Sequence, residues 1–317
     1  MKRILSLVLV LVLALSVLVG CGNQDKGNTE KTYSLATGVV VTETLANSKV
    51  ADTVASIVTD ADGKIVLARL DCVEYTAYDK QGALVTTAPT SKVALGEDYD
   101  AGNYMPSGDW YKQAAAVEKA VVGKTQTEVA ALANDTGYAA DTELAASCSI
   151  NIADLLKAID NAFKSEHKVT FKSTASAFTA GLSVVGSVKV TEKDATETAP
   201  ASTNVKYSAT FSTAVMAEGK VVAAILDTAE PELVGVSVDG SASLSYAGSK
   251  REQGDAYDSY SPMPGGRWYA QADAYAQSAV GKTASDIATL ATEGVAGCTI
   301  GVADYKAGIE AAVKAAR

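Results

Sequence analysis

The hydrophobic pattern of the chain has a period of two in two separate regions, and each region predicts a β-hairpin. In both, two β-rich runs flank a short turn that contains glycine, which is typical of a hairpin. The first runs and turn are Asp52 to Val58, Asp60 to Gly63 and Lys64 to Val73, and the second are Tyr207 to Val215, Ala217 to Gly219 and Lys220 to Leu226. Another alternating stretch, Leu233 to Tyr246, predicts additional strand after the second hairpin.

After each hairpin the apolar positions change to helical spacing. An Ala-rich helix and a short helix are predicted over Trp110 to Val121 and Gln126 to Ala133, and again over Trp268 to Ala279 and Ala284 to Ala291. A final helix has an apolar stripe, formed by Ile152, Leu155, Leu156, Ile159 and Phe163 in one region and by Val302, Tyr305, Ile309 and Val313 in the other. Such a stripe packs on a sheet. Strands followed by helices predict an α+β fold, with each antiparallel sheet covered by the helices that follow it.

Matching segments in the same order indicate that the chain is a tandem duplication. The segments 63–66, 105–111 and 148–150 return as 219–222, 263–269 and 298–300, at offsets of 156, 158 and 150 residues. We therefore expect two homologous domains, residues 33–166 (copy 1) and 170–317 (copy 2), each of ordinary domain size. The joint between them is polar and holds His167, the only histidine. This joint predicts a modest contact between the domains, and a first domain that folds on its own.

The N-terminus has the parts of a bacterial export signal. Two cations, Lys2 and Arg3, precede an apolar run from Ile4 to Val19, which is short for a membrane-spanning helix. The segment 18–21, Leu-Val-Gly-Cys, resembles the lipobox of bacterial lipoproteins. The resemblance implies that residues 1–20 are a signal peptide and that Cys21 carries lipid. The protein is then held at the extracytoplasmic face of the cell membrane, with residues 21–32 as a polar tether.

Composition narrows the classes of partner and chemistry. The net charge of the whole chain is −10, and without residues 1–20, which hold two cations, it is 25 − 37 = −12. An acidic protein of this kind is a poor partner for nucleic acid, whose affinity comes largely from Lys and Arg. A lone histidine and four cysteines without metal spacing leave no zinc site and no His-based catalytic triad. An enzyme with its own substrate is therefore the least favoured function.

Two repeated motifs have a structural and a functional interpretation. Gly123-Lys124-Thr125 and its repeat at 281–283 look like the end of a phosphate-binding loop, but Glu118 and Ala276 stand where that loop needs its first glycine. We interpret both as turns between helices, with the threonine as the cap. The pairs Trp110-Tyr111 and Trp268-Tyr269 could stack on a planar ligand, or anchor the start of a helix on the sheet; the second is favoured.

The segment before each last helix carries the most specific resemblance. In copy 1 it runs from Glu143 to Ser149 and in copy 2 from Glu293 to Thr299. A strand-rich half, helices, and a small-residue turn with Ser or Thr before a final helix resemble the FMN-binding domain family. That family occurs in subunits of sodium-pumping quinone reductases and in exported flavin carriers, with the motif Asp-x-x-Ser-Gly-Ala-Thr.

The resemblance assigns the residues of the motif in this chain. The position of the threonine to which FMN is attached falls on Thr299 in copy 2 and on Ser149 in copy 1. The acidic position falls on Glu293 and Glu143, and the glycine position on Gly297 and Ser147. The family's alanine is replaced by Cys298 and Cys148, and its serine by Ala296 and Ala146. The resemblance implies FMN, covalent or non-covalent, at this turn, with copy 2 preferred because it keeps the glycine and the threonine. A helix start also favours a phosphate.

Two functions remain open from the sequence. In the first, the chain is a membrane-anchored electron carrier, with a flavin transferase and membrane redox proteins as partners. In the second, the same scaffold carries no flavin and serves as a ligand-binding or surface interaction lipoprotein, in which Cys148 and Cys298 are small buried side chains.

Overall fold

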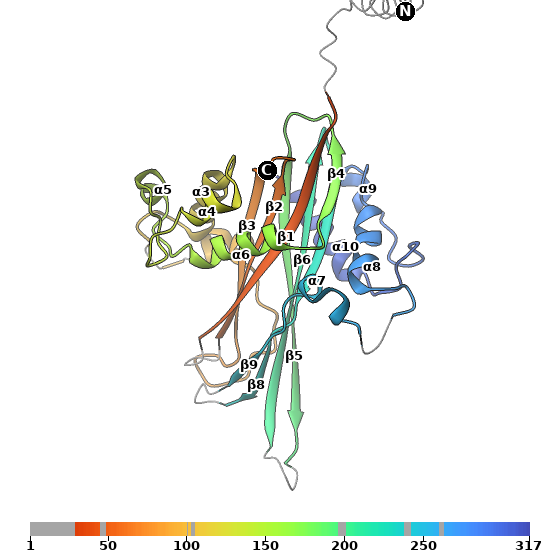
Figure 1. Cartoon of the computed structure of the whole chain (residues 1–317). Coiled ribbons are helices and arrows are strands. Elements are labelled where there is room, and N and C mark those ends of the chain that lie inside the picture. The colour runs from red at the N-terminus through yellow and green to blue at the C-terminus, as the bar shows by residue number, and fades with distance from the viewer. Residues whose placement is uncertain are drawn as a thin grey trace, which may run out of the picture. The chain divides into compact units, whose positions relative to one another are not determined.

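The structure, a computed structural model, describes residues 29–44, 49–99, 101–102, 105–195, 201–237, 242–259 and 263–317 (Figure 1). The predicted signal peptide, Cys21 and most of the predicted tether lie outside these residues. Residues Lys31–Arg317 form one compact unit. No helix in the described part of the chain has the length and apolar character needed to cross a membrane.

Copy 1 builds an antiparallel sheet with the order β3-β2-β1-β4. Its strands are β1 (Lys31–Thr44), β2 (Lys49–Thr59), β3 (Ile65–Thr76) and β4 (Val169–Ser173). The helical segments between β3 and β4 are α2 (Lys92–Leu95), η2 (Gly96–Asp98), α3 (Trp110–Val121), α4 (Gln126–Ala130), α5 (Thr142–Ser147) and α6 (Ala153–Lys164). The apolar stripe of α6 lies in a buried cluster with residues of β1, β2 and β3.

Copy 2 repeats this arrangement around its longest strand, β6. The strand order is β5-β6-β8-β9, with β7 also paired to β6. The strands are β5 (Thr179–Lys193), β6 (Ser202–Ala217), β7 (Lys220–Ala229), β8 (Glu232–Val236) and β9 (Ser243–Ser245). The helical segments are α7 (Lys250–Gln253), η3 (Gly254–Ala256), α8 (Trp268–Gln277), α9 (Ala284–Ile287) and α10 (Ala303–Lys314).

The two copies also share irregular features of the backbone. The β2–β3 hairpin shifts register between Val58 and Thr59, and the β6–β7 hairpin shifts at the equivalent place, between Val215 and Met216. In both copies a glycine of the first strand lies against the last helix, although the two glycines are two residues apart in the strand register. A Cβ on Gly38 would clash with the backbone of α6, and one on Gly181 would clash with the backbone of α10.

The two sheets pack face to face, and the helices of each copy cover its outer face (Figure 1). Two clusters between the sheets combine residues of both copies, among them Val54 with Phe211 and Leu35 with Ile225. Near their middle the hydroxyl groups of Ser56 and Thr213, 157 residues apart, are 2.6 Å from one another. Equivalent residues meet in this way only close to a two-fold axis, so the copies pack like the halves of a symmetric dimer.

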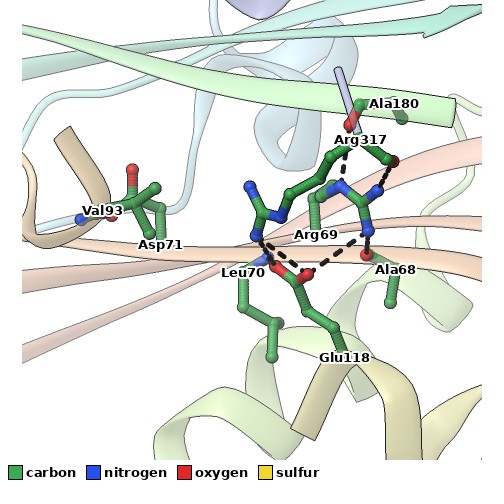
Figure 2. Close-up of polar contacts among 8 residues, drawn as sticks. All are labelled: Ala68, Arg69, Leu70, Asp71, Val93, Glu118, Ala180 and Arg317. Carbon is green, nitrogen blue, oxygen red and sulfur yellow. Dashed lines mark hydrogen bonds and ion pairs between the residues drawn. The ribbon is translucent and has the colours of Figure 1, made fainter. Parts of the chain in front are cut away.

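A charged cluster ties the last residue of the chain to copy 1 (Figure 2). The Arg317 guanidinium pairs with Glu118 on α3 at 3.0 Å, and Arg69 of β3 pairs with the same carboxylate at 3.3 Å. Arg69 also donates to the carbonyls of Ala180, at 2.7 Å, and of Arg317. Burial raises the pKa of Glu118 despite these two cations. The cluster therefore joins α3 and β3 of copy 1 to β5 and the end of copy 2.

The α+β prediction is confirmed, as are both hairpins and the final helices. The expected modest contact between the domains is wrong, because Lys31–Arg317 forms one unit with buried clusters between the sheets. Strand β4 lies at the start of the range assigned to copy 2, yet it pairs with β1 of copy 1. Strand β1 begins at Lys31, two residues inside the predicted tether.

Candidate functional site

The turn predicted to hold a cofactor is held in both copies by a buried glutamine. Gln113 of α3 and Gln271 of α8 are inaccessible to solvent. Gln113 Oε1 accepts hydrogen bonds from the N–H groups of Ser149, at 2.7 Å, and Ile150, at 3.1 Å, and from the Ser149 hydroxyl at 3.2 Å. Gln271 Oε1 accepts from the N–H of Thr299 at 2.7 Å and from its hydroxyl at 2.8 Å.

The other end of each amide is also engaged. The Nε2 group of Gln113 donates to the carbonyl of Gly108 at 2.5 Å, and that of Gln271 donates to the carbonyl of Gly266 at 2.8 Å. Each glutamine therefore connects the loop before the Ala-rich helix to the turn before the last helix. This is a structural role for the most specific motif of the sequence.

These contacts fit an FMN phosphate poorly. The N–H groups that a phosphate would need at this turn already bond to the glutamine carbonyl. A phosphoester at Thr299 would remove the hydroxyl hydrogen that Gln271 accepts, and would bring an anion to a carbonyl oxygen. Gly265 lies beside this contact, and its lack of a side chain leaves room for it, because a Cβ there would lie 2.9 Å from Thr299 Oγ1. FMN attachment at Thr299 or Ser149 stays a prediction, and the side chains around both positions argue against it.

The remaining residues of the predicted motif do not gather around one ligand. Glu143 and Glu293 are exposed. Glu143 and Ser147 line a surface groove of about 240 Å³ with Lys119 and Lys124, but Ser149 is not among the residues that line it. Gly297 has a positive φ of 78°, so it shapes the turn of copy 2. Cys148 is buried and Cys298 half-buried; burial raises the pKa of both thiols, which makes neither a ready nucleophile.

The repeated tryptophans anchor helices, as the favoured interpretation has it. Trp110 and Trp268 are 7% and 3% exposed and begin α3 and α8 in the cores of their copies. Both Gly-Lys-Thr segments are turns between helices, and Thr125 and Thr283 each form a capping box with the next helix. Neither motif is a phosphate loop.

The structure reveals a second repeated site, which the sequence interpretation missed. In copy 1 the carboxylate of Glu74 bonds to the ammonium groups of Lys49 and Lys92, each at 2.9 Å, and to the Tyr99 hydroxyl at 3.1 Å. Burial alone would raise the pKa of Glu74, but the two lysines bring it below its usual value. The carboxylate is therefore ionised and fixed in place.

Copy 2 has the same cluster at equivalent positions. Glu230 pairs with Lys206 at 2.9 Å and with Lys250 at 3.2 Å. Lys250 lies 5.0 Å from the ring centre of Tyr257 and 5.4 Å from that of Trp268, close enough for cation–π attraction. In copy 1, Lys92 lies over the equivalent rings of Tyr99 and Trp110, at 4.7 and 5.2 Å.

In copy 1 this cluster borders an open cavity of about 210 Å³ between the sheet and α6. Strands β1, β2 and β3 supply one wall, and the starts of α2, α3 and α6 supply the others. The lining residues are Thr42, Lys49, Ala51, Thr53, Cys72, Glu74, Lys92, Trp110, Asn151, Asp154 and Leu155. Charged groups, hydroxyls and one indole therefore converge on a single small space. The repetition of Lys49, Glu74 and Lys92 at offsets of 156 to 158 was the signal in the sequence that could have located it.

The described residues include no group of three or more metal-binding side chains of the His, Cys, Asp and Glu types.

No family model, curated protein or solved structure matches the chain.

Proposed function

We propose that the chain is a membrane-anchored, extracytoplasmic lipoprotein that binds a small ligand without a flavin. The observation that carries the proposal is the copy 1 cavity, which is bordered by the fixed Lys49–Glu74–Lys92 cluster and by Trp110. Convergent polar groups beside an aromatic wall are the usual composition of a ligand pocket. The glutamines at the motif turns support the flavin-free version of this function, because they already occupy the donors that a phosphate would use.

The size and charge of the cavity limit the ligand. Typical pockets for drug-sized molecules have about 300–1,000 Å³, so about 210 Å³ suits a smaller compound. Glu74 is matched by two lysines, and Asp154 stands at the exposed rim. A neutral or zwitterionic compound would leave this balance undisturbed.

The ligand function is tested by thermal unfolding of the purified full-length protein in detergent with a panel of amino acids, sugars, small carboxylates and small aromatic compounds. A ligand at about 100 times its Kd stabilises a protein by about 2.7 kcal/mol, which raises Tm by several degrees. The matched control is Leu155→Tyr, which places in copy 1 the residue found at the equivalent position, 305, of copy 2. We expect a compound that raises the Tm of the parent and leaves the Tm of this variant unchanged.

Two outcomes would count against the ligand function. One is a panel in which no compound raises Tm, and the other is equal stabilisation of the parent and the Leu155→Tyr variant. A protein that purifies yellow, with FMN bound at Thr299 by peptide mass spectrometry, would favour the electron carrier instead.

The anchor is tested separately, since it rests on residues 1–21 alone. Growth with a tagged fatty acid should label the protein, and Cys21→Ala should remove the label and release the protein from the membrane fraction. Cys72→Ala is the matched control, because Cys72 is buried and should leave the label unchanged. A Cys21→Ala protein that stays labelled would overturn the lipoprotein assignment.

A further inference from the structure

The repeated site differs between the copies at one position on the last helix. Leu155 of α6 corresponds to Tyr305 of α10, at the offset of 150 residues that also relates Ala153-Asp154 to Ala303-Asp304. The surrounding positions are similar in both copies: Lys92 corresponds to Lys250, Trp110 to Trp268, and Cys72 to Thr228. A side chain that changes from leucine to tyrosine on a shared scaffold changes how the shared space is filled.

In copy 2 the phenol of Tyr305 fills this space. Tyr305 is buried, and its ring centre lies 6.1 Å from that of Trp268 in an edge-on arrangement. Its hydroxyl is 3.4 Å from Thr228 Oγ1. Burial raises the pKa of the Tyr305 phenol, and the positive charge of Lys250 lowers it in part.

In copy 1 the equivalents of these neighbours line the open cavity. Cys72, Lys92 and Trp110 all face it, and Leu155 provides a shorter, apolar wall where copy 2 has the phenol. An engineered protein cavity of about 150 Å³ accepts benzene, so about 210 Å³ accommodates one substituted six-membered ring. Copy 2 thus shows which chemical group this arrangement of side chains holds.

We propose that copy 1 binds a small hydroxylated aromatic compound in the place that the Tyr305 phenol takes in copy 2. The ring lies against Trp110 and Leu155, and its hydroxyl points to the polar end formed by Cys72, Lys92 and Thr53. In copy 2 the chain's own Tyr305 side chain occupies the same site. The inference rests on the proposed ligand-binding function and names the ligand class of its cavity.

The probe is p-cresol, which has the structure of the tyrosine side chain. Calorimetric titration of the full-length protein should find one binding site per chain for the parent and none for Leu155→Tyr. Tyr305→Leu opens the copy 2 space and should bind a second molecule of p-cresol. Tyr305→Phe keeps the ring in copy 2, so this variant should still bind one molecule of p-cresol per chain. Toluene, which lacks the hydroxyl, should bind at least about ten-fold more weakly, since a hydrogen bond to a charged group contributes about 1.5–3 kcal/mol.

The results separate this inference from the function on which it rests. If the parent binds a non-aromatic compound of the panel and this binding is lost in Leu155→Tyr, but p-cresol does not bind, the ligand class is wrong and the function stands. If neither the panel compounds nor p-cresol bind, both the ligand class and the ligand-binding function are wrong. Equal affinity for toluene and p-cresol would also overturn the assignment of a hydroxylated ligand. If Tyr305→Leu does not fold, the parent, Leu155→Tyr and toluene measurements still decide the question.

Discussion

At the scale of single residues, the polar side chains that organise this protein are buried and act on the backbone. Gln113 and Gln271 recur at the offset of the duplication, yet a glutamine in an Ala-rich helix resembles a solvent-exposed position when only the sequence is considered. Nothing local indicates that its amide spans two loops. The sequence therefore located the turn before each last helix, but it did not show that a glutamine amide bonds to this turn. The role of Ser149 and Thr299 as attachment positions stays a prediction.

Replacing Gln113 should lower the free energy of unfolding. In Gln113→Leu the N–H groups of Ser149 and Ile150 lose their acceptor, and each unsatisfied buried group costs about 1–3 kcal/mol. We expect the free energy of unfolding to fall by about 2–4 kcal/mol in urea titrations. The exposed Gln277→Leu is the control and should change it little. Equal effects of the two substitutions would show that the connection between the two loops through Gln113 does not stabilise the fold.

Asp52 predicts a pH dependence of stability. It lies on the face of β2 between the sheets, fully buried, and neither of its carboxylate oxygens has a hydrogen-bond partner in the described part of the chain. Burial raises the pKa of Asp52 to about 8, whereas an aspartate in an unfolded chain titrates near 3.9. Between these values the folded state keeps a proton that the unfolded state has released. The contribution of Asp52 to stability is therefore intact below about pH 4 and is lost progressively as the pH rises to about 8.

Asp52→Asn removes this titration while keeping the shape of the side chain. The variant should be more stable than the parent by on the order of 3–5 kcal/mol at pH 7.5, and the difference should shrink towards pH 4. Urea unfolding at several pH values measures both. Asp135→Asn is the exposed control and should show no such trend. A parent whose stability does not decline between pH 5 and pH 8 relative to Asp52→Asn would contradict the account.

At the scale of elements, the sequence predicted those helices and turns whose bounds depend on neighbouring residues of the chain. Helix α3 has the bounds expected from its apolar spacing, and the two Gly-Lys-Thr turns are capped as their sequences indicate. Strand β1 escaped notice because Gly38 and several hydroxyl residues interrupt its alternation. The reason for Gly38 is tertiary, since α6 crosses the strand at this residue, and no pattern within 31–44 reveals it.

Gly38→Ala tests that crossing. Its Cβ would fall within the contact distance of the α6 backbone at Ala158 and Ala162, so the helix has to move. Overpacking of this kind typically costs about 1–3 kcal/mol, and we expect a loss at the upper end because backbone cannot rotate away. Gly301→Ala meets nothing within 4 Å and serves as the control. Thermal unfolding should separate the two by several degrees, and equal Tm values would show that α6 does not press on β1.

At the scale of the whole molecule, the duplication was readable but the way the copies pack was not. Both faces of β2 and β6 are buried, one under helices and one under the other sheet. The expectation of a modest contact rested on the polar joint around His167, which carries no information about the faces of the sheets. Ser56, Thr213 and Asp52 give the face between the sheets a polar appearance. The polar groups instead bond to each other, as Ser56 and Thr213 do, or stay buried within the interface, as Asp52 does.

This packing predicts that copy 1 does not remain a folded monomer by itself. Residues 31–173 include all four strands of its sheet but expose the face that copy 2 covers. Because the copies are related by an approximate two-fold axis, that face is close to self-complementary, and the fragment should associate with itself. Analytical ultracentrifugation should find dimers or larger species. A monomeric fragment that unfolds cooperatively would show that the interface is dispensable.

The copy 1 cavity beside Trp110 is the proposed ligand site, and the two indoles of the chain allow it to be tested separately from copy 2. The chain has two tryptophans, so Trp268→Phe leaves Trp110 as the only indole emitter and Trp110→Phe leaves Trp268. Titration of both full-length variants with p-cresol, followed by tryptophan fluorescence, tests this site most directly. We expect a saturable change of the Trp110 emission that disappears when Leu155→Tyr is added, and no saturable change of the Trp268 emission. A response confined to Trp268, or one at Trp110 that survives Leu155→Tyr, would contradict the proposed site.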